Sequence, residues 1–141
     1  MSISSEGRTA WQLLSEVLAG ERSRLPAIAD DLGLSEAQCH VLRELDPEAP
    51  IAMCRVAEAL GCDPSNVTGI VRRLEERKLV ERRADERDRR VKQLVLTVRG
   101  RALRQQLLDA LSEPPSMLES LSPADQKMLC AILRRAVGRE D

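Results

Sequence analysis

Residues 63–100 read DPSNVTGIVRRLEERKLVERRADERDRRVKQLVLTVRG, and the order of patterns in this stretch predicts the fold. It begins with a helix, for which Asp63 stands at the capping position and Pro64 in the first turn, where a missing N–H costs nothing. A short strand is expected over 79–83 and its partner over 92–97, with a charged turn between them. The sequence therefore predicts a helix followed directly by a β-hairpin.

Another short helix is expected just before this stretch, over about residues 53–60. Gly61 follows it, where a left-handed C-terminal cap is favoured. Only Gly61, Cys62 and Asp63 separate the two helices, and a three-residue turn containing glycine is typical of a helix-turn-helix. The helix pair and the hairpin together predict a mainly α fold with a small β-hairpin wing. In such a winged helix-turn-helix, one helix enters a DNA groove and the hairpin reaches the neighbouring backbone.

The helix that follows Asp63 has one apolar face and one polar face. Its apolar residues recur at the spacing of a buried helical stripe, from Val67 to Leu74. Small polar side chains near its start suit contact with base edges and phosphates, although serine and asparagine are also common at helix starts for local reasons. The candidate DNA-contacting residues of this helix are Ser65, Asn66, Thr68, Arg72 and Arg73.

The turn of the predicted hairpin is rich in charge, from Asp85 to Arg90. An arginine at such a tip can enter a narrow minor groove, where the potential is most negative. Asp88 is placed to accept a hydrogen bond from a neighbouring arginine and to fix its direction. A charged, solvent-exposed hairpin is the alternative explanation. The candidate residues of the wing are Asp88, Arg89 and Arg90.

Charge is unevenly distributed along the chain. Residues 72–104 hold 13 Lys and Arg against 6 Asp and Glu, whereas the rest holds 9 against 17, so that the formal net charge is only −1. A basic segment on an otherwise acidic protein is typical of a surface that binds a polyanion. The net charge of the whole chain gives no sign of this basic surface.

The two ends of the chain carry helices that lie outside the predicted lobe at residues 35–100. Helical stripes run from about residue 9 to 24 and along residues 128–137, and Pro114 and Pro115 must break the helix that Thr97 caps. Residues 8–30 and 101–138 are therefore expected to form a dimerisation region with a second copy of the chain. A two-fold dimer presents two recognition helices about one DNA turn (~34 Å) apart. The alternative is that both ends fold back on their own chain.

Composition excludes several classes of protein. The chain has no Phe or Tyr and one Trp, which argues against nucleic-acid binding through stacked aromatics. It shows no apolar run long enough for a membrane span and no signal peptide, so a cytoplasmic location without membrane contact is expected. No catalytic motif is present, and one histidine with four scattered cysteines gives no metal site, so we expect neither an enzyme nor a cofactor.

Three segments resemble the MarR family (multiple antibiotic resistance regulator) of winged-helix transcription regulators. They are LSEAQCHVLREL, VAEALGCDPSNVTGIVRRLEERKLVERR and DERDRRVKQLVLTVRG, and the likeness extends from about residue 9 to 137 as one domain over 1–141. The resemblance implies a homodimeric repressor of a short palindromic operator, released by a small-molecule effector or an oxidant. It also implies that the helix candidates and the Asp88–Arg90 element contact double-stranded DNA.

Some residues depart from the family pattern. Lys78 replaces the glycine that is usual before the first wing strand, and Gly69 stands where many relatives carry a longer side chain. Two other functions remain open from sequence: a winged helix that docks on a protein, and a thiol-based redox sensor that uses Cys54 or Cys62. Cys39 and Cys130 are expected in the core.

Overall fold

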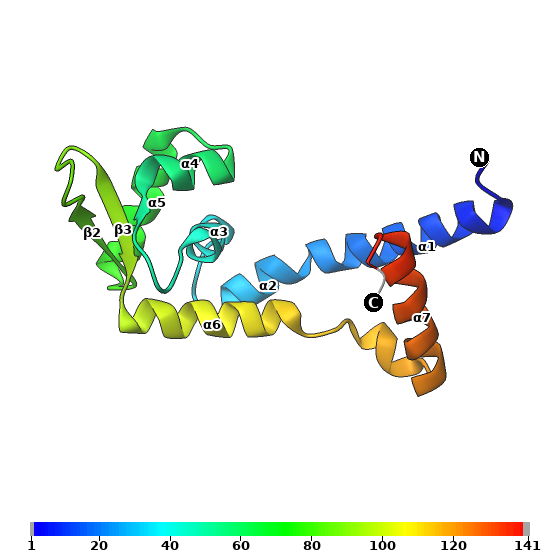
Figure 1. Cartoon of the computed structure of the whole chain (residues 1–141). Coiled ribbons are helices and arrows are strands. Elements are labelled where there is room, and N and C mark those ends of the chain that lie inside the picture. Colours follow the sequence, from blue (N-terminus) through cyan, green and yellow to red (C-terminus); the bar gives the residue numbers. More distant parts are fainter. Residues whose placement is uncertain (1, 140–141) are drawn as a thin grey trace.

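The computed structural model describes residues 2–139 and confirms a mainly helical chain with a small sheet. The helices and strands, in order, are α1 (Ser5–Arg22), α2 (Arg24–Asp31), α3 (Glu36–Glu44), β1 (Ile51–Ala52), α4 (Met53–Leu60), α5 (Pro64–Glu76), β2 (Val80–Ala84), β3 (Lys92–Leu96), α6 (Val98–Ser112), the 3₁₀ helix η1 (Ser116–Ser120) and α7 (Pro123–Ala136). In Figure 1, α3, α4, α5 and the hairpin form a lobe at one end, whereas α1 and α7 lie at the other. Helices α2 and α6 run between these two parts.

The hydrophobic core lies inside the lobe. Its large, fully buried side chains include Leu42 of α3, Leu74 of α5, Leu79 just before β2, Leu94 of β3 and Leu107 of α6. The apolar stripe of α5 is buried as the spacing predicts, with Val67, Val71 and Leu74 at 0% exposure. Branched aliphatic residues therefore build a core without any Phe or Tyr.

The sheet has three antiparallel strands in the order β1-β3-β2, one strand more than the predicted hairpin. The additional strand β1 has only two residues, and Ile51 lies opposite Leu94. In the wing, Arg82 lies opposite Leu94 and Ala84 opposite Lys92. The short strand β1 fastens the loop before α4 to the base of the wing.

The predicted helix caps form as expected, with one exception. Ser35 and Gln38 form a capping box, and Thr97 accepts a hydrogen bond from the N–H of Gly100. Gly61 has the left-handed conformation, with φ at 61°. Asp63 holds the capping position of α5, but its side chain makes no capping hydrogen bond. Backbone geometry and Pro64 therefore begin α5 without side-chain help.

The amino-terminal third differs from the prediction in its helix count. A single helix was expected over about residues 9–24, with Pro26 and Gly33 as breaks. Instead, α1 begins at Ser5, capped by Ser4, and a separate helix α2 spans Arg24–Asp31. Pro26 lies in the first turn of α2, where proline is tolerated because the N–H has no helical partner.

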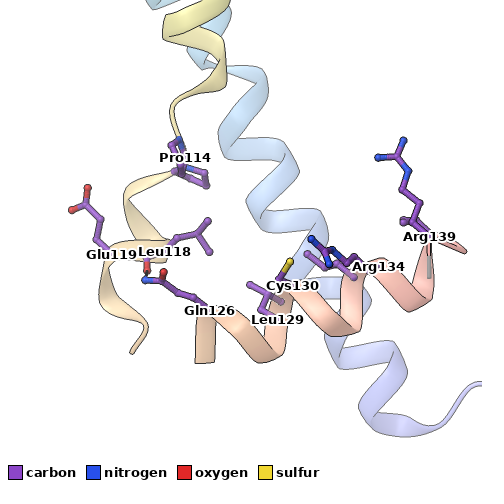
Figure 2. Close-up of a pocket in the computed structure, with 11 residues that line it drawn as sticks. Pro114, Leu118, Glu119, Gln126, Leu129, Cys130, Arg134 and Arg139 are labelled. Carbon is purple, nitrogen blue, oxygen red and sulfur yellow. Dashed lines mark hydrogen bonds between the residues drawn. The ribbon is translucent and has the colours of Figure 1, made fainter. Parts of the chain in front are cut away.

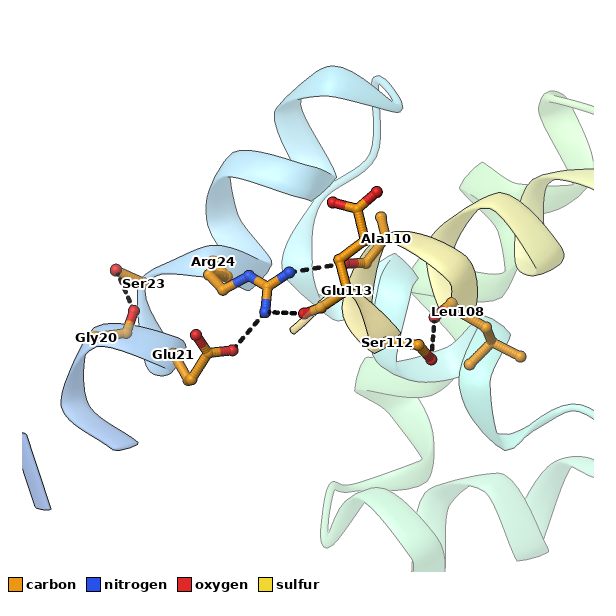
Figure 3. A network of polar contacts seen from close by, with 8 residues as sticks. All are labelled: Gly20, Glu21, Ser23, Arg24, Leu108, Ala110, Ser112 and Glu113. Carbon is orange, nitrogen blue, oxygen red and sulfur yellow. Dashed lines mark hydrogen bonds and ion pairs between the residues drawn. The ribbon is translucent and has the colours of Figure 1, made fainter. Parts of the chain in front are cut away.

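Arginine side chains fasten the helix ends at the junction between the two parts. Arg24 donates hydrogen bonds to the carbonyl oxygens of Ala110 and Glu113 at 2.9 and 2.8 Å, and it pairs with Glu21 at 2.6 Å. Figure 3 shows its guanidinium between that carboxylate and the carboxyl end of α6. Arg104 of α6 similarly donates to the carbonyl of Leu42 in α3, at 3.1 Å. These bonds supply partners for carbonyl groups that a helix end leaves unsatisfied.

Helices α1 and α7 contribute no buried residue to this chain. Their large apolar side chains are exposed, so the terminal helices are not folded back into the core of their own chain. An open groove of about 900 Å³ lies between η1 and α7, with Leu118 on the η1 side and Leu129 on the α7 side (Figure 2). Cys130 borders this groove and is exposed, so the expectation that it is a core residue is wrong.

Candidate nucleic-acid interface

Helix α5 occupies the position of a recognition helix. Its buried stripe packs against α3 and α4, and this packing directs the opposite face to solvent. Helix α4 and the turn at Gly61 hold its amino-terminal end, where the first N–H groups and the helix dipole favour an anion. The helix-turn-helix predicted from the spacing is confirmed.

The exposed face of α5 divides into a centre and two shoulders, as a helical period of 3.6 residues requires. Ser65 and Arg72 lie at the centre, opposite the buried stripe. Asn66 and Arg73 lie seven residues apart on one shoulder, and Thr68 lies on the other, which faces the wing. All five side chains are exposed, so α5 presents the whole predicted set to solvent.

Two of these side chains are restrained within the helix. The Thr68 hydroxyl donates a hydrogen bond to the carbonyl oxygen of Pro64 at 2.9 Å, which leaves its lone pairs and methyl group directed outward. The guanidinium of Arg72 lies 4.0 Å from the Glu76 carboxylate, and both side chains are about 70% exposed. An exposed pair of this kind is weak, so a phosphate can replace Glu76 at little cost.

The wing turn is organised by Asp85, which the sequence reading did not select. Its carboxylate accepts hydrogen bonds from the N–H of Arg87 at 2.7 Å and from Nε2 of Gln93 at 2.9 Å. Its own N–H donates to the carbonyl of Val91, which closes the loop. Aspartate favours such turns because its side chain bonds the backbone two residues on, a signal that the sequence did contain.

The predicted Asp88–Arg90 element forms within this loop. One Asp88 oxygen accepts hydrogen bonds from the N–H and from Nε of Arg90, at 3.1 and 3.2 Å. The Arg90 side chain is 92% exposed, and Arg89 is exposed beside it. Asp88 therefore holds the base of the Arg90 guanidinium and leaves its two NH₂ groups for an acceptor outside the chain.

The cysteines, the possible metal ligands and the hydropathy of the helices bear on other kinds of site. Cys39 is buried, and desolvation raises the pKa of its thiol, whereas Cys54 and Cys62 are exposed. Among residues 2–139 no group of His, Cys, Asp or Glu could hold a metal ion. Across the same residues, every helix is too short or too polar to cross a membrane.

Comparison with known proteins places the chain among transcription regulators. A family model described as the MarR family matches residues 34–92. The HTH-type transcriptional regulator YfiV of Bacillus subtilis is 30% identical over 96% of this chain and 87% of its own length. The HTH-type transcriptional repressor MdtR of the same species is 30% identical over 66% of this chain and 64% of its length.

Solved structures share the fold over nearly the whole chain. YusO from Bacillus subtilis matches with a TM-score of 0.76 at 22% identity, covering 97% of this chain and 99% of its own. A mutant of S. aureus MepR, bound to an oligodeoxyribonucleotide, matches with a TM-score of 0.74 at 21% identity over 92% and 96%. CouR from Rhodococcus jostii RHA1, bound to p-coumaroyl-CoA, has a TM-score of 0.63 at 30% identity over 86% and 87%.

Proposed function

The chain belongs to the MarR family and is a DNA-binding transcription regulator, and we propose that it acts as a homodimeric repressor of a short palindromic operator. The observation that carries the proposal is the pairing of two exposed elements. The outer face of α5 presents Ser65 and Arg72, and the wing presents Arg89 and Arg90 beside it. Groove reading needs both elements, whereas docking on an acidic protein needs only the net charge.

Within this proposal each contact residue has a physical role. Ser65 and Asn66, close to the start of α5, read base edges, and Thr68 offers its methyl group and hydroxyl to the same groove. Arg72 and Arg73 contact phosphates that flank the groove. Arg89 and Arg90 enter the minor groove, and Asp88 orients Arg90 for that contact.

The domain organisation follows the same division. We assign residues 35–100 to the DNA-binding lobe and residues 8–30 and 101–138 to dimerisation. The support for a dimer is the apolar surface on the terminal helices, since a monomer rarely leaves such a surface in water. The exposed large apolar residues of these helices are Trp11, Leu13, Leu14, Leu18, Met128, Ile132 and Leu133.

A small-molecule effector and a cytoplasmic location complete the proposal. The relatives are transcriptional regulators and not enzymes, and we assign no catalytic activity to this chain. The groove between η1 and α7, with its mainly apolar walls, is a candidate site for an organic ligand such as the acyl-CoA ester bound to CouR. The cytoplasmic location is proposed because both matched relatives are bacterial regulators, and a bacterial chromosome lies in the cytoplasm.

Capture of fragmented genomic DNA by the purified protein, at roughly 0.15 M ionic strength, tests the function. We expect enrichment of a few palindromic sites whose half-sites lie about one helical turn apart. Uniform retention of all fragments would indicate a non-specific DNA binder, and no retention would favour docking on a protein partner. Either result would contradict sequence-specific regulation. Sedimentation of the captured complex then tests for two chains per operator.

A further inference from the structure

A second groove, of about 440 Å³, separates α5 from the wing. We call it the wing groove. Helices α4 and α5 provide its first wall through Cys54, Pro64 and Thr68, and the wing provides the second through cationic side chains. The cations that line the wing groove are Arg82, Arg90 and Lys92, of which only Arg90 belongs to the wing tip.

Strand register explains why Arg82 and Lys92 face this groove. Opposite residues in an antiparallel pair point to the same side of a sheet, and alternate residues of a strand share that side. Arg82 therefore shares a side with its partner Leu94 and with Val80, and Lys92 shares it with Leu94. Val80 and Leu94 are buried against the helices. Arg82 and Lys92 therefore lie on the side of the wing that faces the core, outside the part that the core covers.

The two cations are held in different ways. Nε of Arg82 lies 3.0 Å from a carboxylate oxygen of Glu75 on α5, and both side chains are only about 30% exposed. This pair joins the wing to α5 and leaves the two NH₂ groups of the guanidinium directed elsewhere. Lys92 forms no ion pair with any residue between 2 and 139.

Two of the three cations in the wing groove have a carboxylate partner, Arg82 in Glu75 and Arg90 in Asp88. The third, Lys92, adds a positive charge that a bound anion would neutralise. Thr68 lines the wing groove and is also part of the exposed contact face of α5, so the groove adjoins that face. An anion in this groove would meet Arg82, Lys92 and the amino-terminal turn of α5 together.

We propose that the wing groove binds a phosphate of the DNA backbone, with Arg82 and Lys92 as its contact residues and Glu75 as a positioning residue. The inference rests on the proposed function, since it names further contacts for the same DNA. According to this inference, the DNA strand that passes between the recognition helix and the wing is bound at one defined position. Phosphate contacts of this type set the register of a protein on DNA and carry no base sequence.

The first test is substitution of Lys92 by Gln, with Lys127→Gln as the matched control because Lys127 is exposed on α7, away from the lobe (Figure 1). We expect Lys92→Gln to weaken binding to operator and to unrelated duplex by the same factor. The slope of log K against log salt should fall by about 0.9, the value for one phosphate contact. An unchanged slope, or a loss confined to the operator, would overturn the assignment.

The second test uses Cys54 as a built-in probe of the wing groove. In a Cys62→Ser variant, alkylation by iodoacetamide is followed at Cys54 and Cys130 by peptide mass spectrometry, with and without duplex DNA. We expect DNA to slow alkylation of Cys54 several-fold and to leave Cys130 unchanged, since Cys130 lies on α7 (Figure 2). Unaltered alkylation of Cys54 at saturating DNA would overturn the proposal.

These tests separate the groove from the wider function. At low salt an unrelated duplex binds through charge alone, so protection of Cys54 does not depend on finding an operator. Loss of sequence-specific binding with protection retained would therefore refute the regulator and not the groove. Equal protection by inorganic phosphate, with no further protection by DNA, would assign the groove to a free anion and would overturn the inference.

Discussion

Gly100 lies so close to Leu79 that a Cβ atom on Gly100 would be 1.9 Å from the Leu79 carbonyl oxygen. The same carbonyl accepts a hydrogen bond from the N–H of Thr97 at 3.1 Å, and the Thr97 hydroxyl donates to the neighbouring Lys78 carbonyl at 2.7 Å. The start of α6 therefore packs directly against the residue that precedes β2. Leu96, Thr97 and Gly100 meet at this contact, and they end the third segment that resembles the MarR family.

Gly100→Ala should destabilise the fold by at least about 2 kcal/mol, because the methyl group collides with backbone that cannot move independently. Urea unfolding followed by circular dichroism measures the effect. Gly20→Ala is the control, since a Cβ at that helical position meets nothing within 4 Å. Equal unfolding midpoints for wild type and Gly100→Ala would show that α6 and the wing separate readily.

Lys78 adopts the left-handed conformation, with φ at 57°, at the position where the resemblance to the family implies a glycine. The left-handed conformation costs a residue with a Cβ atom about 1–2 kcal/mol. For glycine the cost is roughly 0.5–1 kcal/mol, from the chain entropy lost on folding. Lys78→Gly should therefore stabilise the protein by up to about 1 kcal/mol, measured as a shift in the urea midpoint. Gly61→Ala, at φ 61°, should shift it the opposite way. A lower midpoint for Lys78→Gly would refute strain at this turn.

Gly69 stands at the outward face of α5, and a Cβ atom there would meet nothing within 4 Å. Gly69→Ala should stabilise the helix by about 0.5–1 kcal/mol, as glycine-to-alanine changes in exposed helices do. We expect weaker operator binding in the same variant, because the glycine lets the helix backbone approach the bases closely. Thermal melting and fluorescence anisotropy measure the two effects separately. Higher melting temperature with unchanged affinity would remove Gly69 from the DNA contact.

Arg90→Ala should weaken operator binding by about 1–3 kcal/mol, since it removes the cation at the wing tip without touching the core. Asp88→Asn keeps the shape of the turn and loses the charge-assisted hold on Arg90, so a smaller loss is expected. Anisotropy titration on operator and unrelated duplex compares both with Arg55→Ala, a change at an exposed arginine of α4. Wild-type affinity in Arg90→Ala would eliminate the wing tip from the interface.

The parts of the fold that sequence predicted are those that depend on local signals. Caps at Ser35 and Thr97, and the buried stripe of α5, follow from residue types at fixed offsets. Strand β1 escaped prediction because two residues display no period, and α2 because Pro26 reads as a break when its place in the turn is unknown. Both elements are stabilised by contacts with distant segments, which exist only in the folded chain.

The interface was predictable to a similar degree. The outward residues of α5 follow from periodicity, but the contacts that hold the wing depend on strand register and on approach of distant segments. Asp85 meets Gln93 across the hairpin, and Glu75 meets Arg82 between helix and strand. Cys130 was misjudged for a related reason, since an apolar stripe on α7 shows that a face is to be covered but not by which chain.

Arg24 joins the α1–α2 junction to the end of α6 through the carbonyls of Ala110 and Glu113 (Figure 3), and removing its side chain should weaken this connection. Hydrogen bonds from a charged donor contribute about 1.5–3 kcal/mol, so Arg24→Ala should lower the free energy of unfolding by that order. The change also loosens the angle between the terminal helices and the lobe. Operators with one base pair inserted between half-sites should consequently bind Arg24→Ala with less penalty than wild type. Arg22→Ala, at an exposed position on α1, is the control, and identical spacing preference in all three proteins would show that the lobe orientation is fixed elsewhere.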